Sequence, residues 1–442
     1  MEVCTVGGYG EIGKNMTAIK IGEEVIIIDM GIYLPALLNL ENEEQQRGLS
    51  ITELYNLGVV PDDGVIKDWK SKVKAIVLGH CHLDHIGAVQ YIAKKYNCPI
   101  YGSPYTIQVL RALLKDDRRR KNDLDLRPIS QDKKVKVSKN FQLELITVTH
   151  STAQASITTL HTPEGAIMYT LDYKLDNHPT LGKKTNYPRL REVAKEGVKL
   201  LIDESLYADV DMKTPSEKVA KEMLKDVLLS VESKNRAIFV TTFASHLARI
   251  STIMDAAARL KRKVLILGRS MYKYINAAED LKLVNFSAKA EFGSYRAKSA
   301  ALLEKVSKDP GKYLVICTGN QAEPGSVLVR MINKEFHYKF NEKDIVIFSC
   351  RTIPQPLNIA NREMLESKLR RNKVRIFKDI HVSGHASRED HRDFIHMIKP
   401  KFIIPAHGDH QKEAALAQLA AEEGYIVGKN VFLMADGQKM EI

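Results

Sequence analysis

Short apolar runs rich in β-branched residues alternate with helix-like segments along nearly the whole sequence. The runs lie at residues 25–29, 73–79, 143–149, 166–172, 199–203, 236–242, 264–268, 313–318, 344–349 and 401–407. This alternation predicts an α/β protein. Many of the runs end in a polar or glycine-bearing turn, and in open α/β sheets ligands gather at the carboxyl ends of the strands. We therefore expect the functional residues at those ends.

The length and composition are those of a globular protein with more than one domain. The 442 residues suggest two or three domains, and the chain is 44% hydrophobic and 27% charged. No run approaches the ~18 apolar residues that span a bilayer. The N-terminus, MEVCTVGGYG, leads directly into an expected strand and glycine turn rather than a signal segment. These features predict a protein of the cytoplasm with no membrane partner.

Cysteine usage and net charge limit the kinds of site and partner that the protein can have. The five cysteines are scattered and form no CxxC pair, which argues against a disulfide framework or a thiolate zinc site. The net charge of +12 favours a polyanionic partner such as RNA or DNA. A solvated basic surface is the alternative interpretation of the same charge.

The stretch GHCHLDH at residues 79–85 is the densest group of metal-ligating side chains. His80 and His82 are two residues apart at the end of an expected strand, so both imidazoles project to the same side and are placed to hold one ion. Asp84 and His85 follow in a turn, displaced from the first pair and placed to serve a second ion. The apolar residues after them recur at helical spacing, which predicts a helix from about residue 84 to residue 96.

Three further ligand candidates follow other apolar runs: His150, Asp172 and His407. Each alone is a weak signal, since a single histidine is more often a core or surface residue than a ligand. Together with the cluster they make seven nitrogen or oxygen ligands, enough for two ions if Asp172 bridges them. Mixed imidazole and carboxylate ligands suit zinc or manganese, and two metals ~3.5–4 Å apart are typical of phosphoester or acyl hydrolysis.

These residues resemble a known superfamily. The cluster followed by His150, Asp172 and His407 is similar to the metallo-β-lactamase fold, in which two αββα halves carry a dinuclear site at their shared edge. Seven more motifs resemble the β-CASP nucleases, specifically the ribonuclease J family, and extend the resemblance from residue 7 to residue 411. They are GGYGEIGKN (7–15), TPSEKV (214–219), TFASHLARI (242–250), GRSM (268–271), TGNQAEPGS (318–326), VSGHAS (382–387) and IPAHGDHQ (404–411).

The resemblance implies a role for each ligand candidate. By it, one Zn²⁺ is held by His80, His82 and His150, and the second by Asp84, His85 and His407, with Asp172 shared. Asp84 is also counted among the catalytic residues. The GGYGEIG stretch lacks the spacing of a dinucleotide or P-loop motif, so we interpret it as a structural turn at the rim of the site.

The resemblance also implies an acid–base pair. Glu204 matches the acidic motif after the first half-domain, and the stretch Ser383, Gly384, His385, Ala386 and Ser387 would lie against the scissile phosphate. Hydrolysis needs a proton donor for the departing 3′ oxygen. His385 suits this because histidine titrates near neutral pH, and Glu204 would orient it. The alternatives are a simple helix cap at Ser387 and a salt-bridge role for Glu204.

The position of the last ligands predicts an inserted domain. His385 and His407 lie more than two hundred residues beyond Asp172, so the chain must leave the metal-bearing domain and return. We expect a metallo-β-lactamase domain at 1–207 and 350–442, and a β-CASP domain at 208–349. In the insert, Ser245, Arg269, Gly319 and Gln321 sit at expected strand ends facing a cleft for single-stranded RNA. The resemblance implies a 5′-monophosphate pocket there, which we assign to Ser245, Ser383 and the turn at 318–321.

Several positions depart from the family pattern. Gln154 replaces a usual aspartate, Leu171 a usual glycine and Glu204 a usual aspartate, which affects contacts behind the ligands.

Segments 34–57 and 115–127 interrupt the alternation as expected surface insertions. The chain ends at Ile442 without the extra domain of bacterial ribonuclease J, so it resembles the shorter archaeal form. We expect a homodimer through other surfaces, with the two insertions as candidates for its interface or for guiding RNA.

The expected function is a zinc-dependent 5′ to 3′ exoribonuclease, with Mn²⁺ as the alternative metal. A β-CASP endoribonuclease like the polyadenylation-specificity-factor nucleases is the nearest alternative, although those carry N-terminal RNA-binding domains. An inactive RNA-binding scaffold is disfavoured by the seven intact ligands and His385. A hydrolase of small thioesters or lactams is disfavoured by the motifs of the insert.

Overall fold

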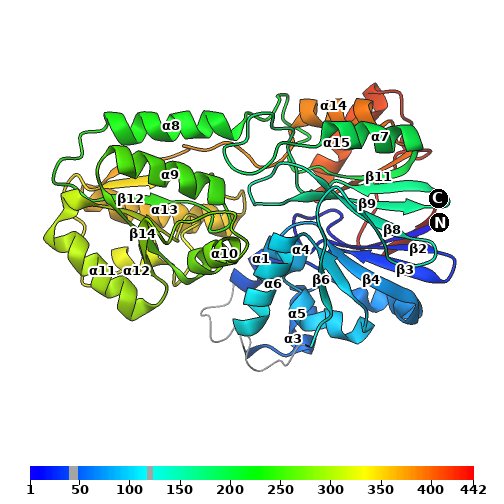
Figure 1. The fold of residues 1–442 in the computed structure, drawn as a ribbon, viewed down its shortest axis with the longest axis horizontal. Helices are drawn as coiled ribbons and strands as arrows, with labels where there is room; N and C mark the ends of the chain where they lie inside the picture. Colours follow the sequence, from blue (N-terminus) through cyan, green and yellow to red (C-terminus); the bar gives the residue numbers. More distant parts are fainter. Residues whose placement is uncertain (39–47, 117–122) are drawn as a thin grey trace.

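The computed structural model describes residues 1–38, 48–116 and 123–442. Figure 1 shows two lobes, with both chain termini in the same one. That lobe contains two sheets, and the other lobe contains a third. The α/β class predicted from the alternating runs is therefore confirmed.

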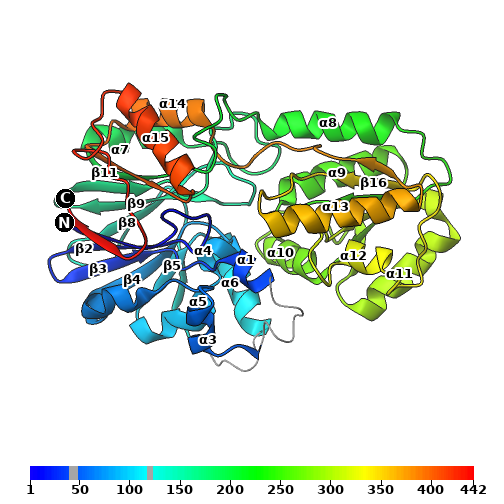
Figure 2. The same cartoon turned by 180° about the vertical axis from the view of Figure 1, so that it is seen from behind.

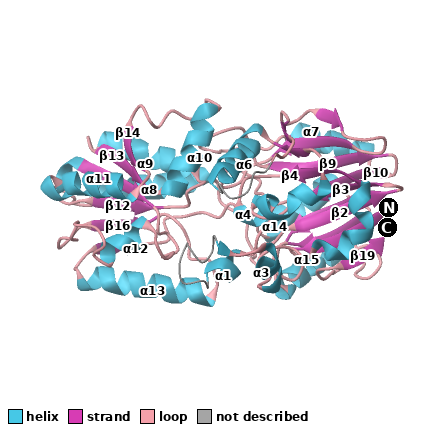
Figure 3. Ribbon diagram, turned by 90° about the horizontal axis from the view of Figure 1, so that it is seen from below, coloured by secondary structure: helices cyan, strands magenta, loops and turns pink. Residues whose placement is uncertain are grey.

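Two sheets pack face to face in the lobe that holds the termini (Figure 3). The first has the order β19 (Gln438–Glu441), β1 (Glu2–Gly7), β2 (Met16–Ile21), β3 (Glu24–Ile28), β4 (Val73–Leu78), β5 (Ile100–Gly102) and β6 (Leu126–Pro128). The second has the order β18 (Phe402–Ala406), β11 (Val198–Glu204), β10 (Gly165–Tyr169), β9 (Ser156–Thr162), β8 (Gln142–Thr147) and β7 (Lys134–Lys136). Fully buried side chains such as Val77 from the first sheet and Leu145 from the second form the core between them.

Helices cover the outer face of each sheet, which completes the predicted αββα sandwich. The first sheet carries α1 (Leu34–Leu38), α3 (Ile51–Asn56), the 3₁₀ segment η1 (Asp63–Lys72), α4 (Leu83–Ile86), α5 (Val89–Ile92), the 3₁₀ segment η2 (Ala93–Tyr96) and α6 (Pro104–Asp116). The second carries α7 (Tyr187–Glu196), α14 (Arg388–Ile398) and α15 (His410–Glu422). Leu190, Phe394 and Leu416 of these three helices bury apolar surface against the second sheet, which drives the layers together.

The other lobe is an α/β unit around a parallel sheet (Figure 2). Its strand order is β14 (Ala290–Gly293), β13 (Lys263–Leu267), β15 (Tyr313–Cys317), β12 (Ile238–Thr241), β16 (Ile345–Phe348) and β17 (Arg375–Phe377). The helices of this lobe are α8 (Glu217–Ser230), α9 (Leu247–Arg259), α10 (Arg269–Asp280), α11 (Arg296–Lys308), α12 (Val327–Ile332) and α13 (Pro356–Arg371), with a 3₁₀ turn η3 (Pro310–Lys312). Because all its strands are parallel, their carboxyl ends meet at one edge.

The chain leaves the sandwich after β11 and returns to it with α14 and then β18, as the positions of His385 and His407 predicted. The third sheet continues past residue 349, where we expected the insert to end, since β17 pairs with β16. We therefore propose that the inserted domain extends to about residue 377 and keep 208 as its predicted start. The two lobes touch through α6 and α10, where the Tyr105 hydroxyl donates a 3.1 Å hydrogen bond to the Tyr274 carbonyl.

The helix expected after the histidine cluster is broken into short pieces. Ile86, Val89, Ile92 and Tyr96 are all buried, as their spacing predicted. The helix is interrupted because the backbone N–H of Ala88 bonds to the carbonyl of Met30, at the end of β3, over 2.9 Å. The chain is thereby held against the first sheet at the point where an uninterrupted helix would leave it.

Three further expectations concern membrane-spanning helices, disulfide bonds and the two surface insertions. No helix of the described residues has the length and apolar character needed to cross a bilayer. All five cysteines are free, in line with the absence of a disulfide framework. Of the two expected insertions, residues 39–47 and 117–122 lie outside the described residues, so their role as a dimer interface or RNA guide stays a prediction.

A buried arginine ties the inserted domain together where it joins the sandwich. Arg249 on α9 has no exposed surface and makes two bonds of 2.7 and 2.9 Å to the Glu217 carboxylate. It also donates to the carbonyls of Ser349 and Ile380, over 3.0 and 3.2 Å, on segments that follow β16 and β17. One side chain thus links the start of the inserted domain to its end.

We expect Arg249→Ala to lower the free energy of unfolding by ~3–5 kcal/mol, because it leaves the Glu217 carboxylate buried without its partner. Urea denaturation followed by circular dichroism measures this. Arg259→Ala, at the exposed end of the same helix, is the control and should change the free energy by less than ~0.5 kcal/mol. Equal, small effects of both substitutions would show that the buried pair does not hold the domain.

Candidate metal centre

Seven predicted ligands converge at the edge of the sandwich that faces the inserted domain. His80 and His82 follow β4, His150 follows β8, Asp172 follows β10, and His407 comes directly after β18. Asp84 and His85 lie on α4. The ligating atoms form two groups, each lying within 4.8 Å of one another: His80, His82, His150 and Asp172 in the first; Asp84, His85, Asp172 and His407 in the second.

The first group has the spacing of ligands around one ion. Nδ1 of His82 lies 3.1 Å from Nε2 of His80 and 3.2 Å from Nε2 of His150. The Asp172 Oδ2 atom is 3.3 Å from Nε2 of His80 and 3.6 Å from Nε2 of His150. Zinc–nitrogen bonds of ~2.0–2.1 Å place tetrahedral ligand atoms about 3.3–3.4 Å apart, so the four atoms fit such an ion.

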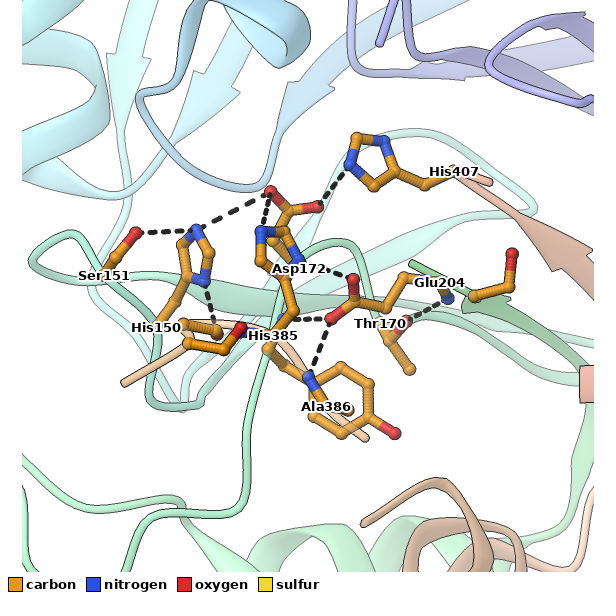
Figure 4. Close-up of polar contacts among 12 residues, drawn as sticks. His150, Ser151, Thr170, Asp172, Glu204, His385, Ala386 and His407 are labelled. Atoms are coloured by element: carbon orange, nitrogen blue, oxygen red, sulfur yellow. Dashed lines mark hydrogen bonds and ion pairs between the residues drawn. The ribbon is translucent and has the colours of Figure 1, made fainter. Parts of the chain in front are cut away.

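Asp172 joins the two groups through its second oxygen. Its Oδ1 atom is 3.2 Å from Nε2 of His85 and 3.6 Å from Nε2 of His407. Asp84 completes this group, with its Oδ2 atom 3.6 Å from His85 Nε2. Figure 4 shows the Asp172 carboxylate between His150 and His407. Oδ1 of Asp172 is buried and accepts no hydrogen bond from the described part of the chain, which is the situation of an oxygen that a cation would satisfy.

The protonation states suit cation binding. Burial lowers the pKa of His82 to about 3 and lowers the pKa of His150 well below its usual value. Burial alone would raise the pKa of Asp172, but the surrounding imidazoles, His85 first, hold it well below the usual range. Neutral imidazoles and ionised carboxylates are the forms that bind metals. His85 is the exception, since burial would lower its pKa but three nearby carboxylates, Asp172, Asp84 and Asp29, outweigh burial and raise it.

Residues behind the ligands fix their orientation. Nδ1 of His407 donates to the Asn15 side-chain oxygen over 3.0 Å, and Asn15 Nδ2 donates to the Asp84 carbonyl over 3.0 Å. Asp29 receives Nδ1 of His85 at 2.5 Å and the Gly79 backbone N–H at 3.0 Å. Such outer partners set ring orientation and tautomer in metal sites.

Asn15 and Asp29 were not among the predicted site residues. Asp29 carries the same signal as the others, a polar residue at the end of an apolar run, VIIID. Asn15 closes the GGYGEIGKN motif, which we had interpreted only as a turn. Both are fully buried.

His385 and Glu204 form the predicted pair. Nδ1 of His385 lies 2.6 Å from the Glu204 Oε2 atom, and Nε2 of His385 lies 4.0 Å from Asp172 Oδ2 (Figure 4). The Glu204 Oε1 atom accepts the backbone N–H groups of Tyr173 and Ala386, over 3.0 and 3.3 Å. Burial disfavours a charged imidazole, but Glu204 and Asp172 outweigh it and raise the pKa of His385 to about 9. The Nε2 atom of His385 is thus directed at the metal groups, and the role of this histidine as a proton donor stays a prediction.

The rest of the SGHAS stretch holds this histidine in place. The Gly384 carbonyl accepts Nδ1 of His150 at 2.7 Å. A Cβ atom at Gly384 would lie 2.9 Å from the Ser151 backbone nitrogen, so only glycine permits this approach. The Ser383 hydroxyl accepts the His385 N–H at 3.0 Å, and Ser387 caps α14 in a capping box. The cap interpretation of Ser387 is thus correct alongside the placement of the stretch at the site.

The inserted domain reaches the site through Ser245. Its hydroxyl lies 2.9 Å from Nε2 of His82, so it contacts a predicted ligand directly. Arg269 begins α10 at the same edge of the third sheet. The side-chain amide of Gln321 bonds to the backbone of Arg351 and Ile353 over 2.8 Å, and Gly319 has a φ of 116° in the same turn. RNA contacts of Arg269, Gly319 and Gln321 stay predictions.

Two of the departures from the family pattern have a structural counterpart. Leu171 has a φ of 53°, a left-handed conformation that glycine adopts without strain and that costs other residues about 1–2 kcal/mol. The Gln154 side chain accepts the backbone N–H of Tyr105 at 2.8 Å. The site geometry is retained with both residues.

Comparisons with known proteins agree with this geometry. Family models match residues 9–175 (metallo-beta-lactamase superfamily), 234–364 (ribonuclease J, beta-CASP domain) and 373–434 (Zn-dependent metallo-hydrolase RNA specificity domain). The chain is 44% identical to ribonuclease J of Pyrococcus abyssi, covering 100% of this chain and 97% of the relative. It is 42% identical to that of Methanocaldococcus jannaschii, over 99% and 98% of the two chains.

A bacterial relative and a solved structure extend the comparison. Ribonuclease J of Thermus thermophilus is 32% identical over 97% of this chain and 73% of its own. A crystal structure of a protein of unknown function from Enterococcus faecalis V583 has the same fold, with a TM-score of 0.68 over 99% of both chains at 18% identity. From its fold, its histidine and aspartate groups and its full-length relatives, the chain belongs to the ribonuclease J family of metal-dependent ribonucleases.

Proposed function

We propose that the chain is a 5′ to 3′ exoribonuclease that hydrolyses single-stranded RNA from a 5′-monophosphate end and releases mononucleotides. The observation that carries the proposal is the His385–Glu204 pair, which faces two adjoining ligand groups beneath an inserted domain. We also propose that the metals are two Zn²⁺ ions, with Mn²⁺ as the alternative, and that the enzyme acts as a homodimer in the cytoplasm. The mixed nitrogen and oxygen donor set supports either metal.

The proposed assignment of the ligands follows the two groups. His80, His82 and His150 would hold one ion, Asp84, His85 and His407 the other, and Asp172 both. When bound, two divalent ions supply Lewis-acid activation of water and neutralise charge on the phosphate. Asn15, Asp29 and Ser245 keep the ligand rings in their orientations.

His385 is the proposed general acid. Its Nδ1–H donates to Glu204, so the remaining proton sits on Nε2, which faces the metal groups. From there it can be transferred to the departing 3′ oxygen as the P–O bond breaks. Glu204 stabilises the charged imidazole and is itself fixed by two backbone N–H groups. Ser383 and Gly384 place the backbone of this stretch at the scissile phosphate.

One RNA with a labelled 5′ nucleotide tests the proposed direction. It is prepared with a 5′-monophosphate, 5′-triphosphate or 5′-hydroxyl end, incubated with the enzyme and Zn²⁺ or Mn²⁺, and resolved by size. Immediate release of labelled mononucleotide, fastest from the monophosphate, is the expected result. Labelled fragments of intermediate length, formed at the same rate from all three ends, would instead identify an endoribonuclease and disprove the proposed end pocket.

Glu204→Gln should move the alkaline limit of activity to lower pH. Glu204 is the first charge that raises the pKa of His385 to about 9, so a protonated acid is available below that pH and is lost as pH rises through it. Without the carboxylate the pKa of His385 falls towards its usual value of ~6.5, and the alkaline limb of kcat should fall with it. A pH profile of kcat for both proteins at saturating metal measures the shift. If the alkaline limb of the kcat profile were unchanged, His385 could not be the group whose titration sets it.

A further inference from the structure

A basic groove lies on the outer face of the sandwich, between α7 and α14. The two helices pack side by side over the second sheet in both views (Figures 1 and 2). The groove has a volume of about 790 Å³ and an apolar floor that includes Leu175, Met397 and Ile398. We call it the outer groove, and it contains none of the predicted ligands.

The walls of the outer groove carry unbalanced positive charge. Arg191, Lys195, Lys213 and Lys399 line it, with Asp393 as its one acidic residue. Asp393 pairs with Lys213, whereas no carboxylate of the described residues lies within 4.0 Å of the other three cations. Arg191 and Lys195 are one helical turn apart, about 6 Å along α7. The Tyr187 ring lies 5.9 Å from the Arg191 guanidinium in the same wall.

The outer groove adjoins the segments that carry the catalytic residues. Leu175 follows Asp172 by three residues, and α14 begins directly after the SGHAS stretch. Lys213 precedes Thr214, whose hydroxyl donates to the His385 carbonyl over 2.8 Å. The groove is therefore lined by residues that lie close in sequence to Asp172 and to the His385 stretch, at Leu175, at Lys213 and along α14.

We propose that the outer groove binds the part of a single-stranded RNA that lies 3′ of the scissile phosphate. Spaced cations around an apolar floor with an aromatic ring are the features by which proteins hold single strands without reading their sequence. An acidic protein segment would satisfy the charge alone, but Lys213 of the groove directly precedes Thr214, which bonds to His385, and this link to the site favours the substrate itself. This inference rests on the proposed function and adds to it a second contact region for long substrates.

The double substitution Arg191→Glu and Lys195→Glu tests the proposal on the metal-loaded enzyme. Both side chains are exposed, and the substitution is expected to raise KM at least ~10-fold for a 5′-monophosphorylated RNA of about 25 nucleotides. Hydrolysis of a 5′-monophosphorylated trinucleotide, too short to leave the site, should change less than about 2-fold. The slope of log KM against log salt concentration for the long RNA should fall by roughly 1.4, which is ~0.7 for each of the two lost phosphate contacts.

Arg259→Glu with Lys298→Glu is the matched control, since it makes the same charge change at exposed positions of the inserted domain. It should leave both substrates unaffected. Unchanged kinetics of the groove variant on the long RNA would overturn the proposal and leave the groove to another partner. Equal slowing on both lengths would also overturn it, because the effect would then lie at the site. Failure of the unmodified enzyme to cleave the trinucleotide would instead disprove the proposed exonuclease function.

Discussion

Replacing His385 with alanine should slow RNA hydrolysis by about 10²–10⁴-fold while leaving the bound metal unchanged. The imidazole lies 4.0 Å from Asp172 and packs against the rings of His150 and His407, and its other nitrogen is bonded to Glu204. Its loss therefore removes a proton donor but no predicted ligand. Single-turnover cleavage of 5′-monophosphorylated RNA and elemental analysis of the same preparation measure the two quantities.

His82→Ala is the comparison for that result. Its Nδ1 atom lies within 3.2 Å of two other ligand nitrogens, so this variant should lose metal as well as activity. Equal metal loss in the two variants would contradict the separation of acid from ligands. A His385→Ala enzyme with full activity would assign the proton donor to another group.

Asp172→Asn should remove most of the bound metal and abolish detectable hydrolysis. Each oxygen of Asp172 belongs to a different ligand group, so the substitution takes negative charge from both at once. Changes to residues that merely support a ligand weaken metal binding by 10–100-fold, and we expect loss of the shared ligand to cost at least about 100-fold. Equilibrium dialysis followed by elemental analysis gives the stoichiometry and affinity.

Asp176→Asn is the matched control, since Asp176 is a similarly buried carboxylate four residues further on. It accepts the backbone N–H groups of His178 and Glu217, over 2.8 Å each, and belongs to neither ligand group. Its metal content should therefore match that of the unmodified enzyme. Retention of two ions by Asp172→Asn would show that the carboxylate does not bridge.

The strands that end at the site could be predicted from the sequence because they are buried on both faces. VIIID, VKAIVLG and KFIIPAH each form a strand within one or two residues of the expected range. Continuous apolar runs of this kind are characteristic of strands that are buried on both faces, and β18 shows this pattern although it lies at the edge of its sheet. Polar residues that follow such runs are therefore easy to recognise, which is why the seven ligand candidates could be named.

Features that depend on long-range pairing could not be predicted. The C-terminal strand QKME is short and mostly exposed, and it forms only by pairing with β1 across the chain. The pairing of β17, RIF, with β16 could not be predicted either, because β17 is also short and only partly buried. Local sequence carries little signal for edge strands, since their stability comes from the neighbouring strand.

The outer partners of the ligands show the same limit. Nothing near Asn15 in the sequence indicates that it holds His407, almost four hundred residues away. Ser245 could be linked to the site through its motif, but its contact with His82 depends on how the two lobes pack. Ligand types follow from local pattern, whereas hydrogen-bond partners follow from the assembled fold.

The return of the chain to the sandwich has a consequence for biosynthesis. Glu204 lies on β11, yet its partner His385 and the ligand His407 come from the last sixty residues of the chain, and β18 completes the second sheet beside β11. A nascent chain emerging from the ribosome carries the whole histidine cluster long before it carries those residues. The acid and the second ligand group are thus assembled only after the inserted domain has been synthesised, so a chain released before that point lacks the parts needed to cut RNA.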